Sequence, residues 1–588
     1  MILVFGGTTE GRKAAEVLEQ AGKPFYYSTK TGEQELALRH GVRLDGALDG
    51  AAMQQFCREH DIRLLIDAAH PFAEQLHATV ARVAADLKLP FIRYERIYPK
   101  RDATLEWVDR VEDIRWGDGP LRILSTLGVQ SIARLKPFET ADRHFIYRIL
   151  PRESSIALAH AQGATDGQLC YYREGEDELA ELQRLGPDVL LLKESGLSGG
   201  FAEKVGAAKA LGIRVIAVRR PTPDWSARPL GHSAAAFRLV NGPHGLRRAV
   251  ESLLPDFFSL KSGLTTGTCA TAAAVAAWHR LLTGERPGEV SVTLPDGESI
   301  NVRVGYADGY AFCIKDAGDD PDVTDGAEVR ASVAPSDEFR ILGGEGVGRF
   351  TLPGFDYPPG EAAINRGPRQ MLRENIRGDY EVTISVRDGA ELARRTFNPR
   401  LGIEGGISII GVSGIVQPYS EEAFLESICK CVGVAQASGA ERIVLGSGAK
   451  SEAALKALYP QLPSQAFVQY GNYVGATLKM ADELGVRHLT LGMMLGKAVK
   501  LAAGQMDTHS RRGTFDREFL AQLLVEAGCP IDISAITLVR ELWDLLPADC
   551  IEAFVKVVIG HCHHYCQSLF AGGELTILII DDNGIVYA

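Results

Sequence analysis

The sequence lacks several features that would place the chain in a specialised class. No apolar run reaches the roughly 18 residues that cross a bilayer, so we expect no membrane span and no membrane partner. The first residues carry neither a basic leader nor a cleavage site, and we expect no signal peptide. The ten cysteines form no CxxC pair and no dense framework. We therefore expect reduced thiols and a cytoplasmic protein.

An excess of positive charge is also missing. The formal net charge is −12, and residues 1–259 balance 34 Lys+Arg against 34 Asp+Glu, whereas the remainder carries 29 against 41. This distribution excludes a strongly basic nucleic-acid binder, although it allows a local cationic pocket. The sequence does not decide between a monomer and a homo-oligomer.

What is present indicates several domains of α/β protein. The chain has 588 residues, of which 46% are apolar, and a length near 600 predicts three to four domains. Short apolar strands alternate with helices in the first half, a pattern typical of parallel sheets. Two such runs predict two doubly wound, flavodoxin- or Rossmann-like lobes at about 1–120 and 121–250. The expected strands are 2–5, 24–29, 64–67, 91–94, 122–126, 144–150, 189–193 and 215–218, and the expected helices include 72–88 and 200–211.

A glycine-rich turn follows the first strand. Tight glycines at a helix start let backbone N–H groups approach a phosphate, although the GGxxxG spacing also suits a plain turn. Ser28, Thr29 and Lys30 end the second strand where an acid would hold a ribose hydroxyl. They favour the 2′-phosphate of NADPH, and NADH stays open. The candidate dinucleotide-binding residues are Gly6, Gly7, Thr8, Thr9 and Gly11.

Further polar groups stand at strand ends, where open α/β sheets bind ligands. Each alone is more typical of a cap or turn, but together they favour an anionic ligand between the lobes. The candidate substrate-binding residues here are Arg93, Arg148, Lys193 and Ser195, and His70 is the candidate catalytic residue.

The segments 2–12, 67–72, 93–94, 193–196 and 218–221 resemble those of the precorrin-6A and cobalt-precorrin-6A reductases of cobalamin biosynthesis. The resemblance covers about residues 1–250. It implies reduction of one double bond in a corrin precursor by NADH or NADPH, with hydride delivered to ring carbon 19. It also implies two flavodoxin-like lobes.

The second half follows a short linker at 254–258. Thr265 and Thr266 can cap an alanine-rich helix, where a carboxylate or phosphate could also bind. From about residue 400 we expect α/β structure again, with strands at 407–410, 442–445 and 488–491 and a closing hairpin at 576–580 and 584–587.

Cations in the second half follow a predicted strand. Lys497 and Lys500 share one helix face, and both could bind substrate carboxylates with Thr265 and Thr266. His509, on a loop, could move a proton near neutral pH. A solvated helix face and a loop histidine explain these residues equally well. We expect no bound metal ion, because the acidic run 315–326 and the cluster 561–566 lack standard ligand spacing.

Residues 259–588 are similar to the cobalt-precorrin-5B (C-1)-methyltransferases. The segments that carry the similarity are 263–270, 315–324, 343–348, 363–365, 405–408, 414–416, 471–475, 496–497, 500–504 and 508–510. The resemblance implies S-adenosyl-L-methionine, a cobalt-containing corrinoid substrate, and an α+β part at about 259–400 before an α/β part at 401–588, in a non-standard methyltransferase fold. The candidate residues for S-adenosyl-L-methionine are Gly411, Ser413, Gly414, Gly471, Asn472 and Gly475.

The two resemblances imply consecutive reactions, in which the methyltransferase makes the substrate of the reductase. We therefore expect a bifunctional enzyme of the anaerobic cobalamin route, in which tethering raises the local concentration of the intermediate. Two alternatives stay open. The first half could be a non-catalytic module that binds nucleotide or corrinoid, or it could be an unrelated nicotinamide oxidoreductase.

Overall fold

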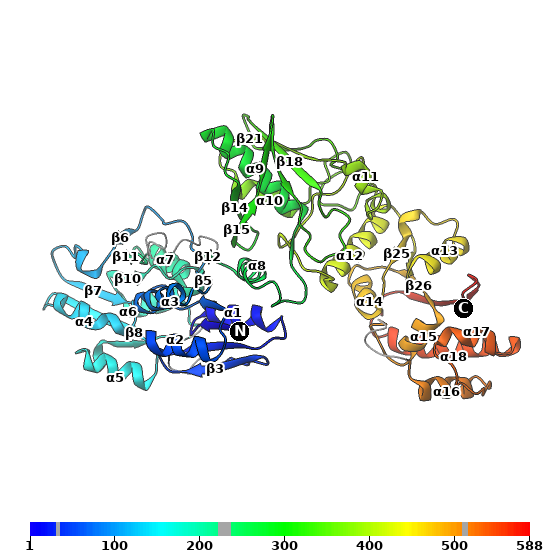
Figure 1. Cartoon of the computed structure of the whole chain (residues 1–588), viewed down its shortest axis with the longest axis horizontal. Coiled ribbons are helices and arrows are strands. Elements are labelled where there is room, and N and C mark those ends of the chain that lie inside the picture. Colours follow the sequence, from blue (N-terminus) through cyan, green and yellow to red (C-terminus); the bar gives the residue numbers. More distant parts are fainter. Residues whose placement is uncertain (31–35, 174, 222–236, 509–514) are drawn as a thin grey trace. The chain divides into compact units, whose positions relative to one another are not determined.

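The chain forms two compact units (Figure 1). The computed structural model describes residues 1–30, 36–173, 175–221, 237–508 and 515–588. The first unit takes in Met1–Lys261 and Asp296–Ile300, and the second takes in Ser262–Pro295 and Asn301–Ala588. Within the described residues, no helix has the length and apolar character needed to span a membrane.

The first unit contains two parallel six-stranded sheets. The first has the order β12-β5-β4-β1-β2-β3. Residues of β1 alternate between two cores: Ile2 and Val4 pack against α1 and α8, whereas Leu3 and Phe5 pack against α2 and α3. Helices on both faces explain why β1 and β4 are wholly buried, and why both are apolar except for Asp67 at the end of β4. The bounds are β1 Ile2–Phe5, β2 Phe25–Thr29, β3 Gly41–Asp45, β4 Leu64–Asp67, β5 Phe91–Tyr94, β12 Phe237–Val240, α1 Thr9–Glu19, α2 Gly50–Glu59, α3 Glu74–Leu87 and α8 Pro243–Leu253.

The second sheet of this unit has the order β6-β11-β10-β7-β8-β9. Both sheets thus follow the 3-2-1-4-5-6 arrangement of a doubly wound dinucleotide-binding fold rather than the flavodoxin arrangement. The bounds are β6 Glu106–Val108, β7 Leu121–Ser125, β8 Arg143–Ile149, β9 Leu169–Tyr171, β10 Val189–Lys193, β11 Arg214–Val218, α5 Glu153–Ala161, α6 Glu178–Leu185 and α7 Phe201–Ala210. The eight strands expected from the sequence in this half agree with these bounds to within one residue.

The two lobes exchange edge strands across the predicted division at residue 120. β6 precedes that point but pairs with β11 in the second sheet, and β12 returns to pair with β5 in the first. Both strands are short and only partly buried. They therefore lack the continuous apolar run that marks the inner strands.

The second unit begins with a helix on a mixed sheet. α9 (Thr266–Thr283) packs on β17 and β18, and α10 packs on α9. The alanines of α9 are buried, and their small side chains let the helix lie close to the sheet. The sheet has the order β16-β17-β18-β21-β19. The bounds are β16 Gly305–Ala307, β17 Tyr310–Ile314, β18 Glu328–Pro335, β19 Arg340–Gly343, β21 Tyr380–Val386 and α10 Arg366–Asn375.

A third doubly wound sheet follows, with the order β25-β24-β26-β27-β28. Its strands are parallel except for β28, which closes the predicted antiparallel hairpin with β27. Figure 1 shows α15 and α18 close together in this part, where they contact each other. The bounds are β24 Ile443–Gly446, β25 Phe467–Gln469, β26 His488–Met494, β27 Glu574–Ile580, β28 Val586–Tyr587, α12 Glu421–Ala437, α13 Ala449–Leu458, α14 Val474–Glu483, α15 Leu495–Ala502, α16 Arg517–Glu526 and α18 Ala548–Cys566.

Two sequence-based expectations fail in the second unit. Residues 407–410 form no strand, because Ile407 and Ile409 make only single bridges to two different loops. Cys529 and Cys550 are joined by a disulfide that links the end of α16 to the start of α18, so not every thiol is reduced.

The close packing of α9 predicts that it tolerates no larger side chain. Ala273→Leu places three extra carbons at a fully buried position and lowers the free energy of unfolding by about 1–3 kcal/mol. Ala457→Leu, on the exposed face of α13, is the matched control and changes stability little. Urea unfolding of the full chain measures both. Equal midpoints for the two variants would contradict this packing.

Candidate functional site

The glycine-rich turn 6–11 lies at the carboxyl end of β1. β1 leads to β2 on one side and β4 leads to β5 on the other, so their ends flank the point where open sheets bind ligands. Thr8 joins the two strand ends: its hydroxyl donates to the Ala68 carbonyl (2.7 Å) and accepts from the N–H of Gly11 (3.0 Å). The turn is therefore fixed directly to the end of β4.

Only glycine fits at two positions of this turn. A Cβ on Gly6 would overlap the Tyr27 hydroxyl, and one on Gly11 would lie 2.6 Å from the same oxygen. Gly7 has a φ of +87°, which glycine adopts without strain. The close backbone at the start of α1 fits the phosphates of a dinucleotide.

A buried ion cluster holds the segment that follows β4. The Asp67 carboxylate is fully buried and accepts from Arg93 (2.8 Å), His77 (2.6 Å) and the N–H of Ala69 (3.1 Å). Arg93 is also fully buried, and it donates to the Ala69 carbonyl and to Glu95. The Arg93 guanidinium therefore positions this segment, and its predicted contact with substrate stays a prediction.

His70 and Lys193 come together from the two lobes. The His70 Nδ1 accepts from the N–H of Phe72 (3.3 Å), and the Lys193 ammonium lies 5.4 Å from the Phe72 ring centroid. Burial lowers the pKa of His70 to about 3, with Lys193 and Arg96 adding to the effect. Burial, aided by Arg96, lowers the pKa of Lys193 to about 8. At neutral pH His70 is thus uncharged and Lys193 is the nearby cation.

A polar link joins the lobes beside these residues, and the sequence-based candidates did not include its main members. Arg96 donates to Glu10 (2.8 Å) and to the Ser195 carbonyl (2.7 Å), and Ser198 donates to Glu10. The Ser195 hydroxyl donates to the Gly199 carbonyl. One indication of a role for Arg96 was present in the sequence, because this residue belongs to the polar segment 93–96 at the end of a predicted strand.

Arg148 is engaged within the protein through one of its terminal nitrogens. It is buried and paired with Glu178 (2.6 Å) at the start of α6, and its predicted role in substrate binding stays a prediction. A cleft of about 890 Å³ opens beside α6 and α7. Its carboxylates outnumber its one cation, Lys204, so it suits a polycarboxylate poorly.

In the second unit, two predicted ligand-binding motifs meet at the start of α9. The Thr265 hydroxyl accepts from the N–H of Thr268, and the Thr268 hydroxyl donates to the Gly414 carbonyl. Thr266 accepts from the N–H of Ile410 (2.9 Å). A Cβ on Gly411 would overlap Thr265. Thr265 and Thr266 are buried and hold the segment 410–414 in place, and the prediction that their side chains bind substrate stays a prediction.

The outer side of that loop offers little polar chemistry. The Ser413 hydroxyl donates to the Ile415 carbonyl and accepts from its N–H. Val412 is 68% exposed and Ile410 is 49% exposed. The loop therefore presents an apolar surface to a ligand.

Lys497 lies at the start of α15, directly after the carboxyl end of β26. The Lys497 ammonium donates to the carbonyls of Gly471 (2.6 Å) and Ser447 (3.3 Å), which follow β25 and β24. β24 leads to β25 on one side and β26 leads to β27 on the other. Burial lowers the pKa of Lys497 to about 8, and the charge of Lys500 adds to this effect.

The predicted loop 471–475 follows β25 at the same edge of this sheet, where Gly471 accepts from Lys497. The Asn472 carbonyl accepts from the N–H of Thr508, and Gly475 donates to the Met506 carbonyl. A Cβ on Gly475 would lie 2.8 Å from Met506, so this approach requires glycine. His509, the predicted proton carrier, lies outside the described residues.

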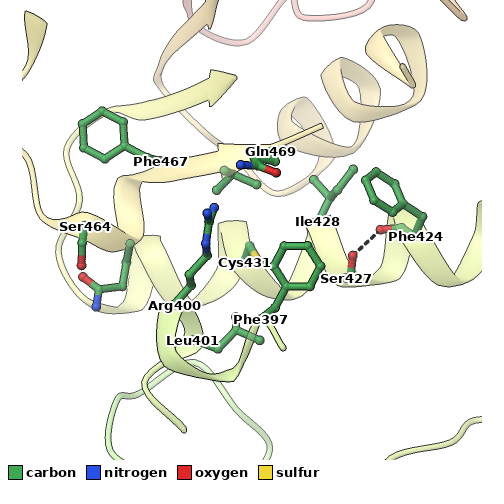
Figure 2. Close-up of a pocket in the computed structure, with 12 residues that line it drawn as sticks. Phe397, Arg400, Leu401, Phe424, Ser427, Ile428, Cys431, Ser464, Phe467 and Gln469 are labelled. Atoms are coloured by element: carbon green, nitrogen blue, oxygen red, sulfur yellow. Dashed lines mark hydrogen bonds between the residues drawn. The ribbon is translucent and has the colours of Figure 1, made fainter. Parts of the chain in front are cut away.

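A separate pocket lies between α12, β25 and the turn near residue 400, as Figure 2 shows. It holds about 20 Å³, which is room for about one water molecule. Arg400 is paired with Glu452 (2.7 Å), and burial raises the pKa of Cys431 to about 11. This pocket is too small for a nicotinamide dinucleotide or for S-adenosyl-L-methionine.

The acidic run 315–326 uses its side chains to close its own loop. Lys315 is buried and pairs with Asp322 (2.7 Å), and Asp325 accepts from the N–H of Ala317 (2.8 Å). Asp320 accepts from the N–H of Tyr419 (3.0 Å). These carboxylates therefore have structural roles in this loop.

Family models match both halves of the chain. The model described as precorrin-6x reductase CbiJ/CobK matches residues 1–240. The model described as CbiD matches residues 255–418, and the CbiD C-terminal domain matches residues 507–588.

Curated relatives match the second half. The cobalt-precorrin-5B C(1)-methyltransferase of Prosthecochloris aestuarii is 44% identical over 345 residues, which cover 55% of this chain and 94% of the relative. The protein of the same name from Geobacillus sp. is 39% identical over 343 residues, covering 54% and 93%.

Two solved structures are also similar. A cobalamin biosynthesis protein (cbiD) from Archaeoglobus fulgidus has 30% identity and a TM-score of 0.26, over 43% of this chain and 83% of that protein. A CobK precorrin-6A reductase has 21% identity and a TM-score of 0.34, over 44% and 96%.

The buried cluster predicts a stability that depends on pH. Burial opposes ionisation of Asp67, but Arg93 and His77 outweigh it and hold its pKa below the usual value. Stability from this carboxylate is therefore complete above its unfolded pKa of about 3.9 and is lost as pH falls through the lower folded pKa. Asp67→Asn lowers the free energy of unfolding by about 3 kcal/mol at pH 7, and the difference shrinks below about pH 4.

Urea unfolding of the full chain between pH 3 and pH 7 measures this dependence. Asp142→Asn, at an exposed position in the same unit, is the control and shifts the midpoint little. A constant difference between wild type and Asp67→Asn across that range would contradict the role assigned to the carboxylate.

Proposed function

This chain belongs to the CbiD family of cobalt-precorrin-5B C(1)-methyltransferases and carries a CbiJ/CobK precorrin-6x reductase region at residues 1–240, and we propose from this that it performs two consecutive steps of cobalamin biosynthesis. The second half methylates ring carbon 1 of cobalt-precorrin-5B with S-adenosyl-L-methionine. The first half reduces the resulting cobalt-precorrin-6A with NADH or NADPH. The observation that carries the proposal is the presence of both regions in one chain, each with a parallel sheet whose neighbouring strands lead to opposite sides.

The turn 6–11 is the proposed dinucleotide site. Gly7, Thr8 and Thr9 present the backbone at the start of α1, and Gly6 and Gly11 allow the close approach that phosphates require. Ser28 and Thr29 end β2 beside this turn, and the N–H of Gly6 donates to the Ser28 carbonyl. Because no acid ends β2, we favour NADPH over NADH.

The proposed corrinoid site of the reductase lies where His70 and Lys193 meet. The reduced nicotinamide supplies a hydride to one face of the corrin ring, and the protein holds the ring, excludes water and supplies a proton. Phe72 offers an apolar surface for the ring. Ser195 fixes the neighbouring loop through its backbone contact with Arg96.

The methyl transfer needs no protein nucleophile. S-adenosyl-L-methionine supplies an electrophilic methyl group, and an electron-rich ring carbon attacks it in line, so the protein contributes positioning and exclusion of water. We assign this cofactor to the carboxyl edge of the third sheet, where Gly471, Asn472 and Gly475 approach closely. Lys497 holds this edge and carries a charge suited to a carboxylate.

The loop 411–414 then fits the corrinoid better than the cofactor. Exposed Val412 in this loop and Ile410 directly before it offer an apolar surface for a macrocycle, and the Ser413 hydroxyl is engaged within the protein. Lys500 and His509 are further candidates for contact with the substrate and for proton transfer. We also propose a cytoplasmic location, where both cofactors are supplied.

If the two reactions use separate sites, a substitution can abolish reductase activity and leave methyltransferase activity intact. Gly11→Ala pushes a methyl group against Tyr27 and raises the dissociation constant for NADPH at least tenfold, measured by fluorescence titration. Gly206→Ala is the matched control, because nothing lies within 4 Å of the added carbon. Methylation of cobalt-precorrin-5B, followed by product mass, stays within twofold of wild type in both variants. Loss of both activities in folded Gly11→Ala would count against separate sites.

The converse variant tests the proposed methyltransferase site. Lys497→Met removes the ammonium that joins the ends of β24 and β25, so the methylation rate falls at least tenfold while NADPH-dependent reduction is retained. Lys479→Met, on an exposed side of α14, is the control. An unchanged methylation rate in Lys497→Met would contradict the assignment of this region to the methyltransferase active site. Methylation by wild type without any reduction would instead favour a non-catalytic first half.

A further inference from the structure

The proposed reduction requires a proton whose source has not yet been identified. The inference drawn from this rests on the proposed function. Hydride addition to ring carbon 19 breaks the double bond and brings two electrons, so the neighbouring carbon must gain a proton. The dinucleotide leaves in its oxidised form and supplies no proton. A group in the protein or a water molecule must therefore act as the acid.

His70, which the sequence predicts as the catalytic residue, is poorly suited to this step. Its Nδ1 accepts from the N–H of Phe72, so the neutral ring carries its only proton on Nε2. A neutral imidazole gives up that proton very reluctantly. The positively charged form is scarce at neutral pH, because burial, Lys193 and Arg96 all oppose it.

The other polar groups nearby are also committed. Arg96 is held by Glu10 and the Ser195 carbonyl, and a guanidinium is too weak an acid to release a proton. Asp67 and His77 form a fully buried pair beneath the segment that follows β4. Of the charged groups described at this place in the first unit, Lys193 is the remaining one with a transferable proton.

The position of Lys193 fits an acid. It ends β10 beside the end of β7, where the connections of the second sheet diverge, and its ammonium donates to the Leu127 carbonyl (3.1 Å). An ammonium has three N–H bonds, so this contact holds the group in place while others can face a ligand. Phe72 and His70, from the opposite lobe, lie against it.

We propose that Lys193 is the general acid of the reduction. As hydride moves from the nicotinamide to ring carbon 19, the electron pair of the double bond takes a proton from the Lys193 ammonium at the neighbouring carbon. Lys193 is left as a neutral amine and regains a proton from water. The products are the reduced corrinoid and the oxidised dinucleotide.

The charges around Lys193 make its proton transferable. The groups that face it are Arg96, from the segment after β5, and His70, from the segment after β4. Burial and Arg96 lower the pKa of Lys193 to about 8, so it is mostly protonated at pH 7 and readily gives the proton up. The reduction rate should therefore fall as pH rises through about 8.

Two substitutions in the full chain separate the acid from a merely structural cation. Lys193→Met removes the proton and the charge, and Lys193→Arg keeps the charge but cannot release a proton. We expect both to lower the single-turnover reduction rate of cobalt-precorrin-6A by at least 100-fold and to remove the decline near pH 8. Lys209→Met, an exposed lysine on α7, and His70→Gln should retain that decline. The dissociation constant for NADPH should change less than twofold in every variant.

A measurement without turnover tests the same group. Labelling of Lys193 by an amine-reactive reagent, read by mass spectrometry in the dinucleotide-free protein, should reach half its maximal rate near pH 8. A midpoint near 10.5 would overturn the proposal. Full reduction by Lys193→Arg, with the wild-type pH profile, would overturn it as well. Failure of wild type to reduce the corrinoid would instead defeat the proposed function, and the two outcomes are distinguishable.

Discussion

The buried pair of Asp67 and Arg93 is the interaction on which the reductase site depends. Both side chains are fully buried, and together they fix the backbone from Asp67 to Ala69. The glycine-rich turn is fastened to this backbone through Thr8 and Ala68. His70 and Phe72 follow within three residues. One ion pair thus sets the relative position of the dinucleotide turn and the residues that face Lys193.

The same construction recurs in each parallel sheet of the chain. The groups proposed to bind ligands stand where neighbouring strands lead to opposite sides: the turn 6–11 between β1 and β4, Lys193 between β7 and β10, and Lys497 between β24 and β26. In the latter two, a partly buried lysine donates to backbone carbonyls at the strand ends. Burial lowers the pKa of both ammonium groups to about 8. Similar geometry can therefore serve proton transfer in one half and binding in the other.

Much of this architecture could be predicted from the sequence, because inner strands of parallel sheets are continuous apolar runs. The edge strands β6 and β12 could not, since they are short and half-buried, and their pairing exchanges segments between lobes. The segment 407–410 is apolar like a strand, yet its backbone pairs with two loops and not with one partner. The apolar pattern of a sequence predicts which residues are buried, but it does not identify the segment with which a strand pairs.

The sequence predicted the candidate site residues less completely than the strands, because it does not show the contacts that each side chain makes. Residue type and position at a strand end identify Arg93, Arg148, Thr265 and Thr266 as polar groups in the right region. They do not show whether a side chain points to a ligand or closes its own loop. The structure assigns all four to internal contacts. Arg96 and Glu10, whose partners lie 86 or more residues away, become visible only when the lobes are assembled.

Central to this account is the claim that one chain performs both reactions in sequence. The most direct measurement gives the purified full-length protein cobalt-precorrin-5B as the sole corrinoid, under anaerobic conditions. S-adenosyl-L-methionine carries a trideuterated methyl group, and NADPH carries deuterium at the transferable position. The account predicts a product with the labelled methyl group and one further deuterium on the ring. A product that carries the methyl label alone, or neither label, would contradict it.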